Sequence, residues 1–248
     1  MLKLKVLLTG LIISLISPLS AQIIIQKPQI DYTKSMMVKK YFAPDADSVL
    51  SAMTEIKGQN RVWDFTVLEF DTSALPRKTE FLDGAALKGV SEFKDISLII
   101  SETFEDTMKF SLYILSDTLL QTVAELSNKK DSVTIMDLVY SPPVTSAVFP
   151  LEYGVTRNFN SVVNFSDFKM SLEFEFTVDG WGELVTPIGK EKVLRIKLGG
   201  SGEFVNQQIT VNNYLFVTGQ SVIIPVAEIQ EIVYGGVSTY SASYRKFY

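Results

Sequence analysis

The amino-acid sequence predicts an all-β protein with a single large antiparallel curved sheet, either a half-barrel or a sandwich of about ten or more strands. Three observations lead to this fold class. Apolar and polar side chains alternate from Phe168 to Val178, which is the period of a strand with one buried face. Strand-like segments recur from end to end of the chain, separated by clusters of turn-forming residues. The composition, 46% hydrophobic and 11% aromatic, is typical of a folded domain and not of a disordered chain.

The chain begins with the layout of a secretory signal peptide. Two lysines precede an apolar run over residues 6–16, and the small residues Ser20 and Ala21 follow it. We therefore expect cleavage after Ala21, which assigns residues 1–21 to a signal peptide and 22–248 to a single β-rich domain. An uncleaved membrane anchor is the alternative, although the apolar run is short for a bilayer span of about 20 residues.

The expected elements follow one another through the whole mature chain. The strand-like segments are 23–26, 62–70, 96–104, 108–115, 119–126, 133–140, 168–178, 182–186, 193–198, 209–217, 227–234 and 239–247. Turns are expected at 105–107, 127–131, 141–143, 179–180, 187–189 and 199–202, where Gly, Pro, Asn, Asp and Ser gather. The Asp-Gly pair at 179–180 suits either a tight turn or a bulge with positive φ. At most one short helix is expected, between Ala46 and Ile56, because Val49, Leu50 and Met53 fall near a 3.6-residue period.

The charge balance argues against nucleic acid as a partner. The full chain carries 23 basic and 28 acidic residues, and loss of Lys3 and Lys5 with the signal peptide leaves 21 against 28, a net charge of −7. Neutralising phosphates requires a basic stripe, and none is visible in the sequence. The sequence also contains no Cys, so disulfides contribute nothing to its stability and a lipid-modified N-terminus is excluded.

The absence of His from the sequence excludes several catalytic mechanisms. Nucleophilic systems that pair Ser or Cys with an imidazole base cannot form, and neither can the common catalytic zinc sites. Carboxylate pairs remain, and Glu173, Glu175 and Asp179 lie close together in the sequence. The alternation favours instead the solvated face of a sheet, where Arg195 or Lys197 of a neighbouring strand could pair with Glu173 and Glu175. No catalytic residue, cofactor or metal site is predicted.

Aromatic side chains are numerous enough to suggest a lined cavity. A curved sheet that bears them on its concave face could hold an apolar ligand. Packing of a core uses the same residue types, so for each of them the alternative is a core side chain. The possible ligand-lining residues are Trp63, Phe65, Tyr140, Phe149, Tyr153 and Trp181.

Five short motifs are spread over most of the mature chain: Trp63-Asp64-Phe65, Phe149-Pro150-Leu151, Asp179-Gly180-Trp181-Gly182, Pro187-Ile188-Gly189 and Val193-Leu194-Arg195. Together they resemble a family of uncharacterised secreted β proteins of Bacteroidetes. In that family the similar segment often precedes a C-terminal domain that directs type IX secretion. The printed sequence ends at Tyr248 without such a domain, so we expect periplasmic residence more than sorting to the surface. The Pro-x-Gly turn with its following strand also resembles half-barrel envelope proteins, including lipoprotein-carrier-like folds.

The function that the sequence favours is non-catalytic binding of an apolar or envelope-derived ligand by an exported protein, located in the periplasm, at the cell surface or outside the cell. A structural or adhesive module at the cell surface is the alternative, and a carboxylate-based glycan hydrolase is a third hypothesis. Space enclosed by the 168–178 face would favour the first, whereas a filled core with an exposed edge strand or aromatic patch would favour the second. After signal cleavage we expect no integral membrane protein.

Overall fold

A computed structural model describes residues 22–44, 46–73, 75–87, 93–105, 107–129, 136–165, 168–219 and 221–248. The expected signal peptide, residues 1–21, lies outside these described residues. No helix in the described part of the chain is long and apolar enough to cross a membrane.

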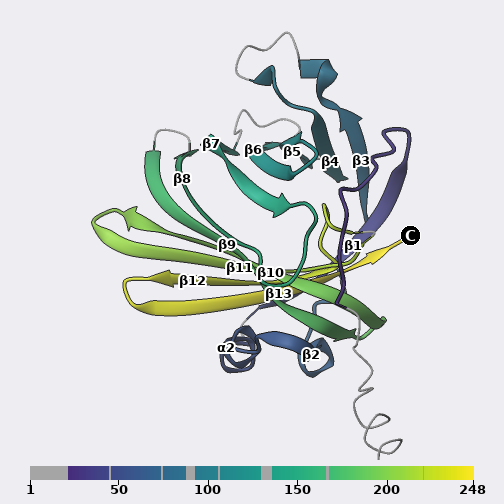
Figure 1. Ribbon diagram of the computed structural model, residues 1–248, viewed down its shortest axis with the longest axis vertical. Coiled ribbons are helices and arrows are strands. Elements are labelled where there is room, and N and C mark those ends of the chain that lie inside the picture. The colour runs from purple at the N-terminus through teal and green to yellow at the C-terminus, as the bar shows by residue number, and fades with distance from the viewer. Residues whose placement is uncertain are drawn as a thin grey trace, which may run out of the picture.

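The described strands form one sheet that closes on itself (Figure 1). The strands are β1 (Ser35–Pro44), β2 (Gly58–Asp64), β3 (Arg77–Asp83), β4 (Leu98–Phe104), β5 (Thr107–Leu115), β6 (Leu119–Lys129), β7 (Met136–Val148), β8 (Thr156–Phe165), β9 (Phe168–Thr186), β10 (Gly189–Phe204), β11 (Gln207–Val217), β12 (Ala227–Tyr234) and β13 (Val237–Phe247). Their order is β10-β11-β12-β13-β1-β3-β4-β5-β6-β7-β8-β9-β2, and β9 also pairs with β10. All of them except β2 therefore make an antiparallel barrel, to which β2 adds a parallel strand along β9.

The all-β class and the short helix are confirmed, and the expected half-barrel or sandwich is in fact a closed barrel. Closure depends on the pairing of the last strand with the first, from Val38 opposite Phe247 to Pro44 opposite Ser241. This pairing joins strands from opposite ends of the chain, so no local sequence pattern predicts it. Closure removes the two open edges that a half-barrel would leave unpaired.

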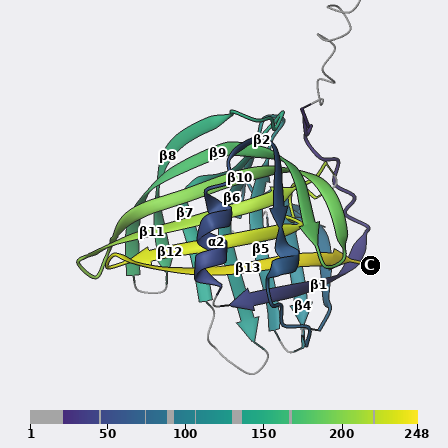
Figure 2. The ribbon, with the colours of Figure 1, turned by 90° about the horizontal axis from the view of Figure 1, so that it is seen from below.

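An outer layer covers one side of the barrel (Figures 1 and 2). It consists of the helix α2 (Asp47–Thr54), the strand β2 and the short 3₁₀ helix η1 (Phe65–Val67). Leu50 and Met53 of α2 are buried with Trp63 and Phe65 in a cluster that includes the outward-facing Phe216 of β11. Since α2 lies within the span between Ala46 and Ile56, its hydrophobic period was read correctly from the sequence.

The strand β9 runs without interruption through Asp179 and Gly180, so the expected turn is wrong there and the alternative, a bulge, is confirmed, although neither residue has a positive φ. Ile196 of β10 pairs with Val178 and Arg195 pairs with Gly180, which leaves Asp179 as the extra residue of a β-bulge. The glycines instead allow β2 to approach β9. A Cβ on Gly182 would lie 1.9 Å from the carbonyl oxygen of Arg61, and one on Gly180 would lie 3.0 Å from the Trp63 ring.

Two other expected turns also lie inside strands. Residues 199–202 belong to β10, where a Cβ on Gly200 would lie 2.8 Å from the ring of Phe174, so the glycine makes room for an aromatic side chain. The chain turns later, at Val205 and Asn206, which both have positive φ. Residues 141–143 belong to β7. The turn at 187–189 is confirmed. At 105–107, β4 ends at Phe104 and β5 begins at Thr107. The expected turn at 127–131 lies partly outside the described residues, with β6 continuing to Lys129.

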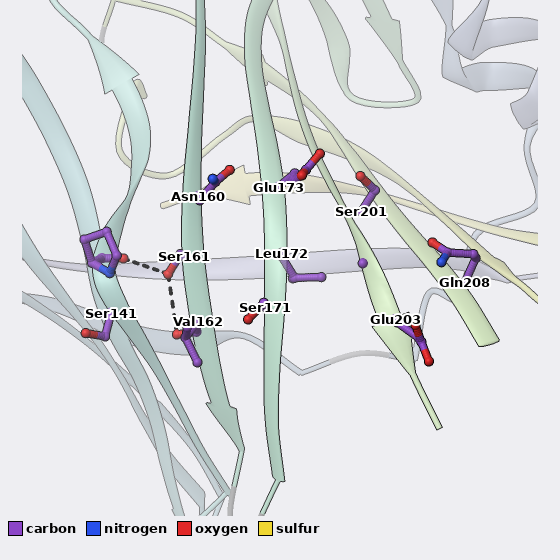
Figure 3. Close-up of a pocket in the computed structure, with 12 residues that line it drawn as sticks. Ser141, Asn160, Ser161, Val162, Ser171, Leu172, Glu173, Ser201, Glu203 and Gln208 are labelled. Atoms are coloured by element: carbon purple, nitrogen blue, oxygen red, sulfur yellow. Dashed lines mark hydrogen bonds between the residues drawn. The ribbon is translucent and has the colours of Figure 1, made fainter. Parts of the chain in front are cut away.

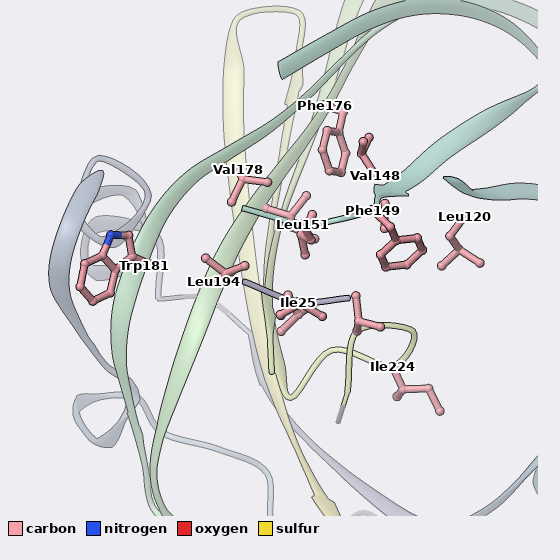
Figure 4. Close-up of a cluster of buried hydrophobic side chains, with 14 of the residues drawn as sticks. Ile25, Leu120, Val148, Phe149, Leu151, Phe176, Val178, Trp181, Leu194 and Ile224 are labelled. Atoms are coloured by element: carbon pink, nitrogen blue, oxygen red, sulfur yellow. The ribbon is translucent and has the colours of Figure 1, made fainter. Parts of the chain in front are cut away.

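Buried apolar side chains fill one end of the barrel, here called the plugged end (Figure 4). Phe176 and Val178 of β9 meet Leu194 of β10 there. The segment before β1 adds Ile25 and the connection between β7 and β8 adds Leu151, and the backbones of these two residues pair with each other. A third cluster packs outside β4–β7, beneath the second 3₁₀ turn η2 (Gly84–Leu87). The described core is thus placed at one end of the barrel and on its outer faces.

Candidate functional site

Beyond the plugged end, the barrel encloses a hollow of about 730 Å³, here called the lumen. At about 30 Å³ per water molecule, this volume equals that of roughly two dozen waters. Side chains from twelve strands of the barrel border the lumen, together with the segment from Val222 to Pro225. A volume of this size lies within the range of ordinary small-molecule sites, about 300–1,000 Å³.

One sector of the lumen wall is apolar. It is formed by β7 to β11, and its aromatic members include Phe165 and Phe174. The Phe174 ring stacks at 5.3 Å on that of Phe159, which packs against the core of the plugged end. The sector's only polar lining side chains among the described residues are Ser146, Asn213 and the Tyr140 hydroxyl. The apolar lining residues of this sector are Leu138, Val144, Val163, Phe165, Met170, Leu172, Phe174, Ile196, Leu198, Val211 and Leu215.

The opposite sector carries charged side chains. A hydrogen-bonded cluster of three of them joins β1, β12 and β13. Glu228 accepts hydrogen bonds from Lys40 and from Nη2 of Arg245, the latter at 3.0 Å. Nη1 of Arg245 also donates to the carbonyl oxygen of Pro225 at 2.8 Å. Burial alone would raise the pKa of Glu228, but the two neighbouring cations outweigh it and lower that pKa to about 2. This cluster, named here the Lys40–Glu228–Arg245 cluster, therefore holds two positive charges and one negative charge.

The charged sector continues over β3 to β6. Arg77 lies 3.6 Å from Glu102 and above the ring of Phe104. Lys109 is the cross-strand neighbour of Glu102, and its side chain remains exposed. Together with Glu125, these groups add two cations and two carboxylates to the wall.

Glu125 of β6 borders the lumen without an ion pair among the described residues. Its side chain is exposed to open space yet surrounded by the barrel wall. The loss of bulk water raises the pKa of Glu125, the charges of Glu228 and Glu102 raise it further, and Lys109 opposes the shift. Burial also raises the pKa of Tyr113, on which the Glu125 charge acts in the same direction. Glu125 is therefore a carboxyl group that is poorly compensated by its surroundings.

The six aromatic residues expected to line a ligand site separate into three places. Tyr140 borders the lumen, as expected. Phe149 and Trp181 are buried at the plugged end, and Tyr153 packs against them there. Trp63 and Phe65 lie on the other side of the sheet, beneath α2, because the bulge and β2 build a second core outside the barrel.

The charged sector was missed by sequence reasoning. In β12, Glu228 and Gln230 alternate with Ala227 and Ile229, and the apolar pair suggests the buried face. Both faces are in fact covered, the apolar one by the outer layer and the polar one by the lumen. An alternation pattern identifies two faces but not which of them points into a barrel.

The three carboxylates of the hydrolase hypothesis do not converge. Glu173 and Glu175 are exposed on the outer face of β9, whereas both side-chain oxygens of Asp179 accept hydrogen bonds from Arg195 at 2.8 Å. Arg195, one of the two partners expected for the two glutamates, thus binds Asp179. No group of three or more residues suited to a metal ion occurs in the described part of the chain.

A second hollow of about 500 Å³ lies among β7 to β11 (Figure 3). Its lining is largely polar and includes Asn160, Glu173 and Gln208. Ser161, which also lines it, donates a hydrogen bond to the carbonyl oxygen of Pro142 at 2.7 Å. This arrangement provides polar contacts but no catalytic pair.

Exposed apolar side chains gather where three strand pairs end, here called the tip patch. The Phe204 ring contacts those of Phe168 and Tyr234 edge to face, and Val205 and Val237 are exposed by about two thirds at neighbouring turns. An aromatic patch of this kind is typical of an interaction surface.

Comparisons with protein-family models, curated proteins and solved structures gave no match to the chain. The resemblance to secreted β proteins of Bacteroidetes therefore stays a prediction.

Proposed function

We propose that this chain is an exported, non-catalytic binding protein that holds an apolar or envelope-derived ligand in the lumen. The observation that carries the proposal is the hollow of about 730 Å³, with an apolar wall over five consecutive strands. Protein interiors are normally packed about as densely as organic crystals, with few voids larger than a water molecule. An apolar ligand in the lumen would replace the contacts that the wall residues lack.

The test combines ligand detection with a variant that fills the lumen. Native mass spectrometry and organic extraction of the purified protein are expected to reveal a bound apolar molecule. The neutral fluorescent probe N-phenyl-1-naphthylamine is expected to bind the extracted protein. Val211→Phe adds an aromatic ring to the lumen wall and is expected to weaken probe binding at least about tenfold, since one ring displaces much of the space the probe needs.

Val67→Phe is the matched control, because Val67 is 61% exposed in the outer layer, away from both the lumen and the tip patch. It is expected to leave probe binding unchanged. A protein that carries no ligand and binds no probe, or a Val211→Phe variant that binds as well as the wild type, would contradict the proposal.

A surface interaction module is the second candidate, and the tip patch favours it. The double change Phe204→Ser and Tyr234→Ser removes two of its three rings. On this hypothesis, the variant loses adsorption to purified cell envelopes, whereas probe binding in the lumen is unaffected. Unchanged adsorption would count against the module.

A further inference from the structure

The lumen wall is divided between apolar and charged side chains, and the division follows the order of the strands. The described lining residues of β7 to β11 carry no ionisable group except the Tyr140 hydroxyl, whereas β1, β3, β4, β5, β6, β12 and β13 carry four cations and three carboxylates. A purely apolar ligand would offer no polar group to the charged side chains of this second sector. A molecule with an apolar chain and a charged head matches both sectors.

We propose that the ligand is a single-chain amphiphile with an anionic head group, a carboxylate or a phosphate monoester. The head lies against Lys40 and Arg245, and the acyl chain lies along the apolar sector. This inference rests on the proposed function, because it names the class of ligand for the same lumen.

The distribution of charge determines the sign of the head group. The Lys40–Glu228–Arg245 cluster has one more cation than anion, and its carboxylate stays ionised down to about pH 2. The remaining cations, Arg77 and Lys109, are matched in number by Glu102 and Glu125. Among the described lining residues, the excess positive charge is therefore located at β1 and β13.

The two cations of that excess are direct neighbours. Lys40 pairs with Arg245 across β1 and β13, and like charges in this position repel each other unless an anion compensates them. Glu228 provides one such anion. The ammonium group of Lys40 has three donors, of which the bond to Glu228 engages one among the described residues. An anionic head group would engage the others in charge-assisted hydrogen bonds.

Glu125 provides an opposite control within the same lumen. Because it is a carboxylate without an ion pair among the described residues, its charge repels an anionic head and attracts a cationic one. Removing the charge of Lys40 and removing that of Glu125 should therefore change affinity in opposite directions. The pair of variants reports the sign of the ligand's charge even when the ligand's exact position is not known.

The experiment uses four ligands with the same palmitoyl or hexadecyl chain, each measured by displacement of N-phenyl-1-naphthylamine below its micelle concentration. The heads are carboxylate (palmitate), phosphate monoester (palmitoyl lysophosphatidic acid), neutral (monopalmitoyl glycerol) and cationic (hexadecyltrimethylammonium). We expect at least one anionic ligand to bind about tenfold more tightly than the neutral one. The tighter of the two anionic arms identifies the head group as a carboxylate or a phosphate.

Lys40→Met is expected to weaken the preferred anionic ligand about tenfold and to leave the neutral ligand unchanged. The matched control is Lys169→Met, which removes a charge from the exposed outer face of β9. Among the described residues Glu125→Gln breaks no hydrogen bond or ion pair, so it is expected to fold normally and to tighten anionic binding by about threefold. Thermal unfolding of each variant separates a binding effect from loss of the fold.

Equal binding of the anionic and neutral ligands, or tighter binding of the cationic one, would overturn the anionic head group while leaving the proposed function intact. So would Glu125→Gln weakening the anionic ligand. Absence of binding by all four ligands and by the probe would instead overturn the proposed function itself.

Discussion

The ion pair between Arg195 and Asp179 is expected to be one of the most important polar interactions for stability. The Arg195 side chain is fully buried between the barrel and the outer layer, where Nε and Nη2 bind the two Asp179 oxygens and Nη1 donates to the Met53 carbonyl oxygen at 3.0 Å. Its guanidinium group also lies 5.4 Å from the Trp63 ring and 5.2 Å from the Tyr214 ring. These contacts join β9, β10, β11, β2 and the end of α2.

Arg195→Met leaves Asp179 charged, 9% exposed and without its partner. Removing one member of a buried ion pair costs about 3–5 kcal/mol, because the other charge stays buried and uncompensated. For a domain of this size, that loss corresponds to a decrease of roughly 6–20 °C in the midpoint of thermal unfolding. Asp179→Leu is expected to cost a similar amount, since it leaves Arg195 without a counter-charge.

The double variant Arg195→Met with Asp179→Leu is expected to be more stable than the sum of the single losses predicts. It removes both charges together, and the unpaired Met53 carbonyl leaves a residual cost of about 1–2 kcal/mol. Urea unfolding followed by tryptophan fluorescence measures all variants, and the double-mutant cycle should give a coupling of about 2 kcal/mol or more.

The exposed pair of Lys190 and Glu183 serves as the control for this cycle. Lys190→Met should change stability by less than about 0.5 kcal/mol, since its side chain is 65% exposed. The reasoning is refuted if Arg195→Met costs less than about 1 kcal/mol, or if the two single losses simply add in the double variant.

Two further predictions concern the close approach of β2 and the lumen cluster. Gly182→Ala places a methyl group 1.9 Å from the Arg61 carbonyl oxygen, so it is expected to destabilise the fold by about 3 kcal/mol or more in urea unfolding. Gly219→Ala, with open space at its Cβ, should stay within about 0.5 kcal/mol of the wild type. The folded pKa of Glu228, about 2, lies below its ordinary value of 4.5, so its contribution of about 3 kcal/mol is present above pH 4.5 and is lost as the pH falls towards 2. Glu228→Gln should lose this component of the pH dependence, and an unchanged slope of stability between pH 5 and 2 would contradict the assignment.

Local patterns in the sequence predicted the elements that depend on near neighbours. The inward face of β9 contains Leu172, Phe176 and Val178 as buried side chains, which confirms the alternation, although Phe168 at the start of the strand is 57% exposed. The period of α2 and the turn at 187–189 were also read correctly. These features require only the period of the side chains and the turn residues.

Glycine was the main source of error, because its role depends on distant segments. The glycines at 180 and 182 accommodate β2, which lies more than a hundred residues earlier in the sequence, and Gly200 accommodates Phe174 of the adjacent strand. The same residue type marks a turn or a close approach, and a single sequence does not distinguish them. The bulge at Asp179 also changes the alternation, so that Trp181 faces inward and Leu184 faces the outer layer.

The arrangement of the core explains how a stable barrel can contain a hollow. Leu194 and Leu198 both point inward from β10, about 13 Å apart by the strand rise. Leu194 is fully buried at the plugged end, whereas Leu198 is half-buried and borders the lumen. Leu194→Ala encloses a new cavity and is expected to cost about 3–5 kcal/mol. Leu198→Ala only enlarges a space that already exists, so no new cavity is formed. It should cost only the free energy of transferring the removed apolar atoms out of water, about 1–2 kcal/mol.

Urea unfolding of these two variants therefore tests whether the lumen is open in solution, independently of any ligand. The side chains are identical and share a strand and a direction, so intrinsic strand propensity contributes equally to both. A large difference between the two losses means that stability resides at the plugged end and in the outer layer, which frees the lumen wall for binding. Equal losses of about 4 kcal/mol would show that the barrel collapses around Leu198 and packs it as tightly as Leu194, leaving no room for an acyl chain.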